Sequence, residues 1–257
     1  MHSEALSFVI AFLGGFLPSF VWLFFWNEEK KSAEPLRALI LAFAGGMAAV
    51  FISLFLEKTV YNIDPNAISH GALWQAFLSW AKAVANMKNV ALGQFLLVTL
   101  FAPIIEETLK FLAAYLLVLR SRDDEEPIDP VIFMITTALG FAAVENMLFL
   151  LDPLTQSSLH VSIYTGNMRF VGAMLLHTVS SATIGLFIGF NFFDTKIEEY
   201  FWGFTGLVAA ILIHSLFNFF MIGSNSLVVL EGIWISVIMV LFIIEKVKRI
   251  RLEKIEK

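Results

Sequence analysis

The chain has 257 residues, of which 58% are hydrophobic and only 15% are charged, against about a quarter charged in an ordinary soluble domain. With a mean hydropathy of +0.80, the apolar residues exceed what one protein core can bury, so lipid must solvate most of them. The net charge of −5 and the lack of a basic tract argue against nucleic acid as a partner. The absence of cysteine excludes disulfides, thiolate metal sites and a cysteine nucleophile.

The apolar runs predict an all-α polytopic transmembrane bundle of about seven spans, which forms a single integral membrane domain over residues 1–257 and has the lipid bilayer as a partner. A helix needs about 20 apolar residues to cross about 30 Å of hydrocarbon. Runs of suitable length occur at about 5–26, 36–56, 93–119, 131–151, 170–193, 200–222 and 227–244. Because no basic segment precedes the first run, we expect it to be a retained span and not a cleaved signal.

Between the second and third runs, residues 64–88 mix polar and apolar side chains. Lys82 and Asn86 alternate with residues such as Leu73 and Trp80 near helical spacing. This pattern predicts an amphipathic helix at the membrane interface. An eighth span in the same stretch is the alternative, because its hydropathy is intermediate.

Basic residues predict the orientation of the bundle. Lys and Arg cluster in residues 245–257, directly after the last apolar run. Such a basic tail predicts a cytoplasmic C-terminus. Alternation back through seven spans places Lys30, Arg37, Arg120 and Lys196 on the same side, which agrees with an excess of positive charge inside.

The third run carries charged side chains near its middle, where they are costly unless they face the bundle interior. Glu106 and Lys110 are spaced i,i+4 in the favourable order, while Glu107 points about 100° away around the helix. We therefore expect one carboxylate to pair with Lys110 and the other to stay available. Pro103 is expected to open or bend the backbone at this depth.

The next three runs also carry polar residues inside the membrane. They are Glu145 with Asn146, His177 with Ser181, and His214 with Asn218. In the last two pairs the i,i+4 spacing presents both side chains on one helix face. At 1.5 Å per helical residue, Glu145, His177 and His214 lie roughly 9, 10 and 12 Å from the outer ends of their spans, and Glu106 roughly 20 Å. These depths predict one shared cavity in the outer half of the bundle.

Together these segments resemble the PrsW family of intramembrane proteases, which belongs with the CAAX prenyl proteases and bacteriocin-processing enzymes in a glutamic-type superfamily. The matching segments are Glu106-Glu107-x-x-Lys110, Phe141 through Glu145-Asn146, His177 through Ser181, and His214 through Asn218. The resemblance covers about residues 93–222, and its four motifs occur in order in consecutive predicted spans. We take this segment as the catalytic core. Many relatives have a third acidic residue before the pair, where this chain has Ile105.

The resemblance implies a protease of the prokaryotic plasma membrane that cuts a membrane-anchored protein, for example an anti-sigma factor. A buried glutamate can act as general base to a water, so we expect Glu106 or Glu107 to have that role. The resemblance assigns His177 to holding the water. His214 and Asn218 are expected to donate hydrogen bonds to the oxyanion. Supporting roles are expected for Lys110, Glu145, Asn146 and Ser181.

Several alternatives remain open at this stage. No metal is expected, because the zincin motif H-E-x-x-H is absent, although His177, His214 and a glutamate would form a known zinc ligand set. The charges in the third run would also suit an ion pair that joins helices. A proton-coupled membrane transporter would keep similar groups inside its bundle, but we find no two related halves. A non-catalytic membrane scaffold is the remaining alternative.

Overall fold

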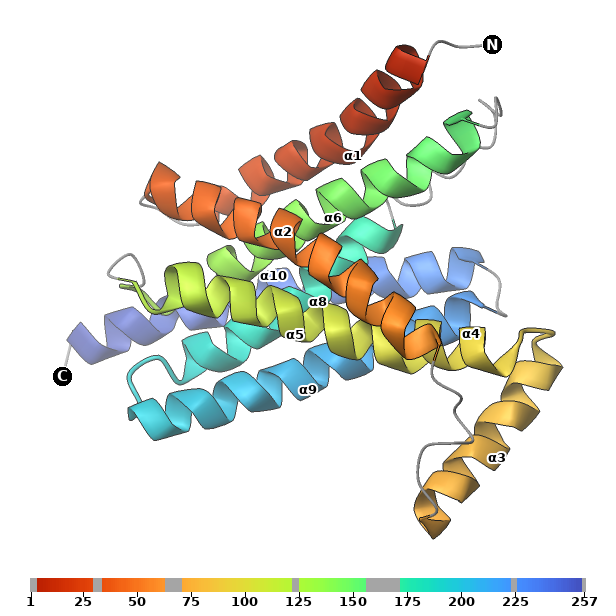
Figure 1. The fold of residues 1–257 in the computed structure, drawn as a ribbon. Helices are drawn as coiled ribbons and strands as arrows, with labels where there is room; N and C mark the ends of the chain where they lie inside the picture. The colour runs from red at the N-terminus through yellow and green to blue at the C-terminus, as the bar shows by residue number, and fades with distance from the viewer. Residues whose placement is uncertain are drawn as a thin grey trace.

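The computed structural model describes residues 4–29, 34–62, 71–121, 125–155, 172–222 and 226–255, which are helical apart from turns and short connections. In chain order the helices are α1 (Glu4–Asn27), α2 (Leu36–Tyr61), α3 (Ala72–Met87), α4 (Leu92–Leu96), the π-helical turn η1 (Leu97–Phe101), α5 (Ala102–Ala114), the π-helical turn η2 (Tyr115–Leu119), α6 (Asp129–Thr155), α8 (Met174–Phe190), α9 (Lys196–Met221) and α10 (Ser226–Ile255). Most of them run along one common direction, and α3 turns away from it (Figure 1).

The all-α membrane bundle predicted from the sequence is confirmed. Within the described residues, five helices are long and apolar enough to cross a membrane: α1, α2, α6, α9 and α10. The predicted span 93–119 corresponds to the continuous helix Leu92–Leu119, which meets the same criterion together with α3 as a bent pair. The predicted span 170–193 corresponds to α8, an apolar helix of 17 residues. Residues 170 and 171 of that prediction lie outside the described residues.

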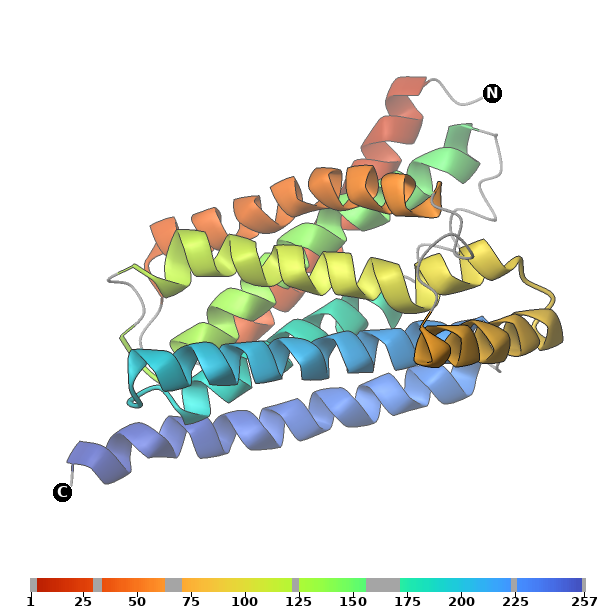
Figure 2. The same cartoon turned by 60° about the horizontal axis from the view of Figure 1, so that its bottom comes forward.

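The centre of the bundle is formed by α6 and α8. α1, α2 and α8 pack against α6, and α9 and α10 pack against α8, with α10 running the whole length of the bundle (Figure 2). Every residue from 127 to 144 is buried, as expected for a helix that is apolar all round. The outer helices instead expose large apolar side chains such as Phe24, Phe55 and Phe242. These outer faces therefore suit contact with lipid tails.

α2 crosses α6 at two glycines. A Cβ atom on Gly46 would lie 1.9 Å from the carbonyl oxygen of Thr137, and one on Gly140 would lie 2.0 Å from the carbonyl oxygen of Phe43. No side chain fits at such distances, so the two backbones are in direct contact, which small residues permit between membrane helices. The crossing fixes α2 against the helix that carries Glu145.

Gly46→Ala is expected to destabilise the protein by about 1–3 kcal/mol, because the added methyl group must push the two helices apart. The matched control is Gly232→Ala on α10, where a Cβ atom would have no neighbour within 4 Å. This control should be neutral or stabilising by up to about 1 kcal/mol, since alanine is the better helix former. Thermal unfolding in detergent measures both variants, and equal stabilities would contradict the close crossing.

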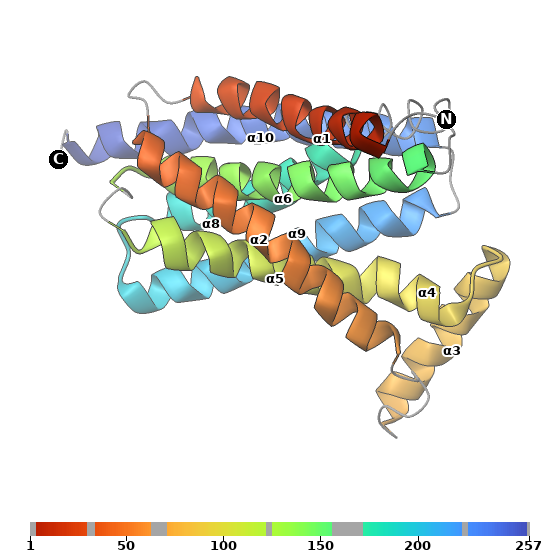
Figure 3. The same ribbon diagram turned by 45° about the horizontal axis from the view of Figure 1, so that its top comes forward.

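The predicted amphipathic helix corresponds to α3. Its 16 residues are fewer than the number required for a span, which is about 20, and its axis is bent by 107° from the helix that follows. The buried face of α3 packs Leu78, Ala81 and Ala85 against Phe95 and Leu96. Length and bend favour the interfacial placement over a separate eighth span (Figure 3). Residues 64–70 of the prediction lie outside the described residues.

An ion pair marks one end of the bundle. The Nζ atom of Lys248 on α10 lies 2.7 Å from Oε2 of Glu29, just after α1. The C-terminal ends of α1 and α10 therefore lie at the same end of the bundle. The predicted basic tail, 245–257, continues α10 as a helix through Ile255, and residues 256 and 257 lie outside the described residues.

Candidate functional site

A cavity of about 370 Å³ lies between α2, η1, α5, α6, α8, α9 and α10. Its lining includes Gly172, Met221 and Leu230, which lie near the helix ends opposite the Glu29–Lys248 pair. Its polar lining residues are Ser53, Glu57, Glu106, Glu145, His177, His214 and Asn218. The fold thus brings polar residues from five of the predicted spans into one cavity.

Glu106 faces the two histidines. Its Oε2 atom lies 3.8 Å from Nδ1 of His177 and 3.9 Å from Nε2 of His214, and the Glu106 side chain is only 9% exposed. This oxygen is buried and has no hydrogen-bond partner among the described residues. Because unpartnered buried polar atoms are costly, the three atoms form a place that suits a water molecule or a cation.

Glu107 points from α5 in a different direction and is fully engaged. Its Oε1 atom accepts hydrogen bonds from Nζ of Lys110 at 2.7 Å, Nδ1 of His214 at 2.7 Å and Oγ of Ser180 at 2.8 Å. Its Oε2 atom accepts a hydrogen bond of 3.2 Å from Ser181. Four donors from three helices therefore hold this carboxylate, which is completely buried.

The structure shows which carboxylate pairs with Lys110, a point that the sequence left open. Lys110 pairs with Glu107 three residues before it, and not with Glu106 four residues before it. Both spacings bring side chains together on a helix, so the neighbouring helices decide between them. Ser180 of α8 and His214 of α9 surround Glu107 with donors.

Hydrogen bonds fix both imidazole rings. The Nδ1 atom of His177 lies 2.9 Å from Nζ of Lys110, and its Nε2 atom lies 3.0 Å from Oε2 of Glu145. Since an ammonium group can only donate, Nδ1 accepts and Nε2 donates to Glu145. In His214, Nδ1 donates to Glu107, so a neutral ring presents the lone pair of Nε2 toward Glu106. An acceptor at this position differs from the oxyanion donor expected from the sequence.

Asn218 stabilises the π-helical turn before Pro103. In η1 the N–H of Ala102 donates to the carbonyl of Leu97, and the next bond of this pattern, to Val98, would need an N–H that Pro103 lacks. Nδ2 of Asn218 donates to the Val98 carbonyl at 2.9 Å instead. This bond connects α9 to the backbone about two turns before the glutamate pair. A second amide hydrogen of Asn218 is left for another acceptor.

Two residues of the site escape the sequence-based reasoning. Ser180 donates to Glu107, although only its neighbour Ser181 falls in the histidine motif. Glu57 lines the cavity, but the second predicted span ends at residue 56 and excludes it. α2 continues through Tyr61. The signal that could have identified Glu57 was therefore an ionisable residue within a helix. Asn146, expected to have a supporting role, is buried on α6 and is absent from the cavity lining.

The site can hold a metal by residue type and spacing. Glu106, His177 and His214 each offer one ligand atom, and these atoms lie within 4.8 Å of one another. Two histidines and a carboxylate form the ligand set of several catalytic zinc sites, and the unpartnered oxygen of Glu106 would gain a partner. Both nitrogens of His177 are already engaged, however, so metal coordination requires His177 to leave Lys110 or Glu145.

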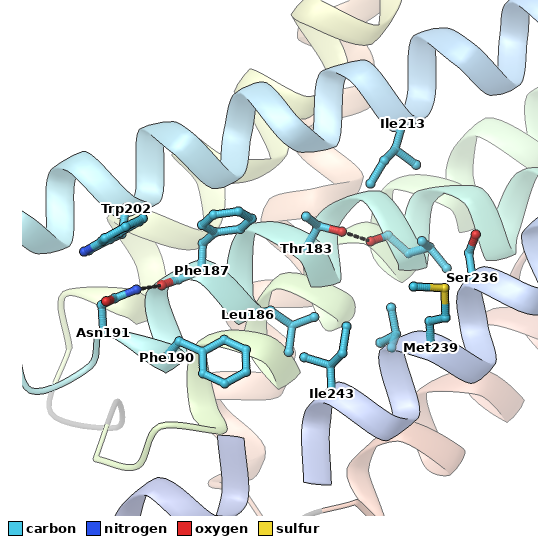
Figure 4. Close-up of a pocket in the computed structure, with 12 residues that line it drawn as sticks. Thr183, Leu186, Phe187, Phe190, Asn191, Trp202, Ile213, Ser236, Met239 and Ile243 are labelled. Atoms are coloured by element: carbon cyan, nitrogen blue, oxygen red, sulfur yellow. Dashed lines mark hydrogen bonds between the residues drawn. The ribbon is translucent and has the colours of Figure 1, made fainter. Parts of the chain in front are cut away.

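A second cavity, of about 430 Å³, lies between α8, α9 and α10 (Figure 4). None of the described residues that line it is titratable. Two of its polar residues bond back to their own helix, Thr183 to the Val179 carbonyl and Asn191 to the Phe187 carbonyl. This cavity offers apolar surface only, so the chemistry of the protein belongs to the smaller one.

Fold and cavity together define a polytopic helical membrane protein with a buried glutamate–histidine site between its spans. The family model described as "PrsW family intramembrane metalloprotease" matches residues 34–244, which include every residue that lines this cavity. The chain belongs to the PrsW family of intramembrane proteases.

Curated relatives support the same assignment. Protease PrsW of Clostridioides difficile (strain 630) is 26% identical over 249 residues, which cover 96% of this chain and 90% of the relative. Protease PrsW of Bacillus subtilis (strain 168) is 21% identical over 199 residues, covering 76% of this chain and 75% of the relative. The chain is therefore a membrane protein of a bacterial protease family. No solved structure matches it at a significant level.

Proposed function

We propose that this protease hydrolyses a peptide bond of a membrane-anchored protein with a water molecule that Glu106 activates. The observation that carries the proposal is the buried Oε2 atom of Glu106, which has no hydrogen-bond partner among the described residues and faces one nitrogen of each histidine. Glu107 suits the role of base less well, because Lys110, His214 and two serines already donate to it.

In the proposed reaction, Glu106 accepts a proton as the oxygen of the water attacks the carbonyl carbon of the substrate. The lone pair of His214 Nε2 accepts the other hydrogen of the water and so orients it. The second amide hydrogen of Asn218 is available for the oxyanion. When the C–N bond breaks, the protonated Glu106 returns its proton to the leaving amine, which restores the carboxylate.

The remaining polar residues of the site position the reacting ones. Glu107 accepts from Nδ1 of His214, an arrangement that fixes the ring and directs Nε2 to the cavity. Lys110 and Glu145 hold the two nitrogens of His177. His177 is thereby held in one orientation beside the proposed water. Because both of its nitrogens are engaged, we assign it a positioning role and not the direct hydrogen bond to the water that was expected from the sequence.

A metal-dependent reaction is the alternative, and the family description, intramembrane metalloprotease, refers to one. Glu106, His177 and His214 would hold the metal, which would lower the pKa of a bound water and polarise the substrate carbonyl. We propose that no metal is needed, because His177 already has Lys110 at one nitrogen and Glu145 at the other.

Elemental analysis of the purified active protein tests this point. We expect well under one equivalent of zinc or another transition metal per chain, and cleavage that persists after chelation. Protein carrying His214→Gln, purified in parallel, gives the background metal content. One metal per chain in the parent, absent from the variant and lost together with activity on chelation, would assign the three residues to a metal centre instead.

The proposed activity is tested with the protein in liposomes that also contain single-span reporter proteins, including anti-sigma factors. We expect truncated reporters with the parent and intact reporters with Glu106→Gln. Proton or solute flux without cleavage would favour a transporter, and neither cleavage nor flux would favour a scaffold.

Following the positive-inside rule, we also propose that the Glu29–Lys248 end faces the cytoplasm, so that cleavage occurs toward the outer face.

A further inference from the structure

The cavity contains more acidic groups than the proposed reaction uses. Glu57, Glu106 and Glu145 line it, and no Lys or Arg occurs among its described lining residues. Lys110, the buried cation of the adjoining hydrogen-bond network, is bound to Glu107 and His177. Carboxylates inside a membrane protein normally pair with a cation or share a proton with one another. The negative charge of this cavity therefore requires a cationic partner.

Glu57 is the carboxylate without another assignment. Glu106 is the proposed base, and Oε2 of Glu145 lies 3.0 Å from His177. Glu57 accepts a hydrogen bond from the Ser53 hydroxyl, one turn earlier on α2, but a neutral hydroxyl does not compensate its charge. Across the part of the chain that the structure describes, no ion pair involves Glu57, which is half-buried.

Glu57 and Glu106 lie at different depths in the cavity. Glu57 lies one turn before the end of α2 at Tyr61, whereas Glu106 lies deeper, with its side chain only 9% exposed and one oxygen unpartnered in the same cavity. A peptide bond held at Glu106 therefore has its flanking residues near Glu57. Lys and Arg commonly flank membrane spans, and their long apolar stems let the charged group reach along an apolar wall.

We propose that Glu57 is a specificity-determining residue, which binds a Lys or Arg side chain of the substrate beside the bond that is cleaved. The protease would then select membrane-anchored proteins with a basic residue at one fixed distance from the cleavage point. This inference is based on charge complementarity. The cationic side chain of the substrate supplies the positive charge that the described cavity residues lack. The inference rests on the proposed function, because it names the substrate of the same site.

The test uses liposomes with a series of single-span reporters that differ only by moving one Lys, with Gln as the neutral reference, through the residues around the cut. For the parent protein we expect one position at which Lys raises kcat/KM by about 10- to 100-fold over Gln, the range for a hydrogen bond to a charged group. Glu57→Gln should lose this preference, so that its kcat/KM values on the Lys and Gln reporters become equal. Gln retains the size of Glu57 and its contact with Ser53.

Two controls separate the interpretations. Glu231→Gln removes an exposed carboxylate of α10 and should keep the preference for Lys. Glu57→Lys should prefer a reporter with Glu at the same position, a reversal that a purely structural residue would not produce. Thermal unfolding of each variant is measured alongside.

A parent protein that cleaves all reporters alike, or a Glu57→Gln variant that keeps the Lys preference, overturns the role of Glu57 and leaves the protease proposal intact. Equal losses on the charged and neutral reporters would also overturn it, because they indicate a general effect of Glu57 on the reaction. If the parent cleaves no reporter at all, the proposed function fails, and the inference fails with it.

Discussion

Glu106→Gln is expected to lower the rate of substrate cleavage by about 10²- to 10⁴-fold, the usual contribution of a general base, while the protein stays folded. Glutamine keeps the size of the side chain but cannot take the proton of the water. The unpartnered oxygen of Glu106 holds no helix in place, so its replacement should change the unfolding temperature little. The measurement is cleavage of a single-span reporter in liposomes, with thermal unfolding in parallel.

The neighbouring glutamate provides the matched control. Glu107→Gln replaces a carboxylate that accepts from four donors, so its main expected effect is on stability, with activity falling as His214 loses its orientation. If Glu107→Gln abolished turnover in a fully stable protein and Glu106→Gln cleaved normally, the assignment of the base would have to be exchanged between the two residues.

Hydropathy alone predicted the membrane bundle because the length of an apolar run reflects the thickness of the hydrocarbon. The same measure was less accurate at the ends of the helices. The second run was predicted to stop at residue 56, where charged residues begin, yet α2 continues to Tyr61 and brings Glu57 into the cavity. A span whose end is set by hydropathy stops before a charged residue, even where a cavity inside the protein accommodates that residue.

Spacing along single helices predicted which residues are candidates but not their partners. The choice of Lys110 between the two glutamates depends on α8 and α9, which supply Ser180, Ser181 and His214 to Glu107. Likewise, Asn218 was expected to donate to the oxyanion, and the sequence did not reveal that one of its hydrogens is used for a backbone carbonyl that a proline leaves without a donor. Such contacts join residues more than 70 positions apart, so no local pattern contains them.

Lys110→Met is expected to destabilise the protein by about 3–5 kcal/mol, the usual consequence of removing one partner of a buried ion pair. Lys110 is completely buried and donates to both Glu107 and His177. Methionine fills similar space but leaves the carboxylate of Glu107 with neutral donors and the ring of His177 with one unsatisfied nitrogen. Thermal or denaturant unfolding in detergent measures the loss, and Lys58→Met, at an exposed position of α2, shows the effect of removing a lysine alone.

A double variant separates the charge from the packing. Lys110→Met combined with Glu107→Gln removes both charges of the buried pair, so its destabilisation should be smaller than the sum of the two single effects by about 0.5–3 kcal/mol, the range for residues in direct contact. Strict additivity would mean that the two side chains do not interact in the folded protein. In that case the pair at 2.7 Å would contribute packing only. The orientation of His214 and His177 would then have to depend on the remaining hydrogen-bonding residues of the network, which are Ser180, Ser181 and Glu145.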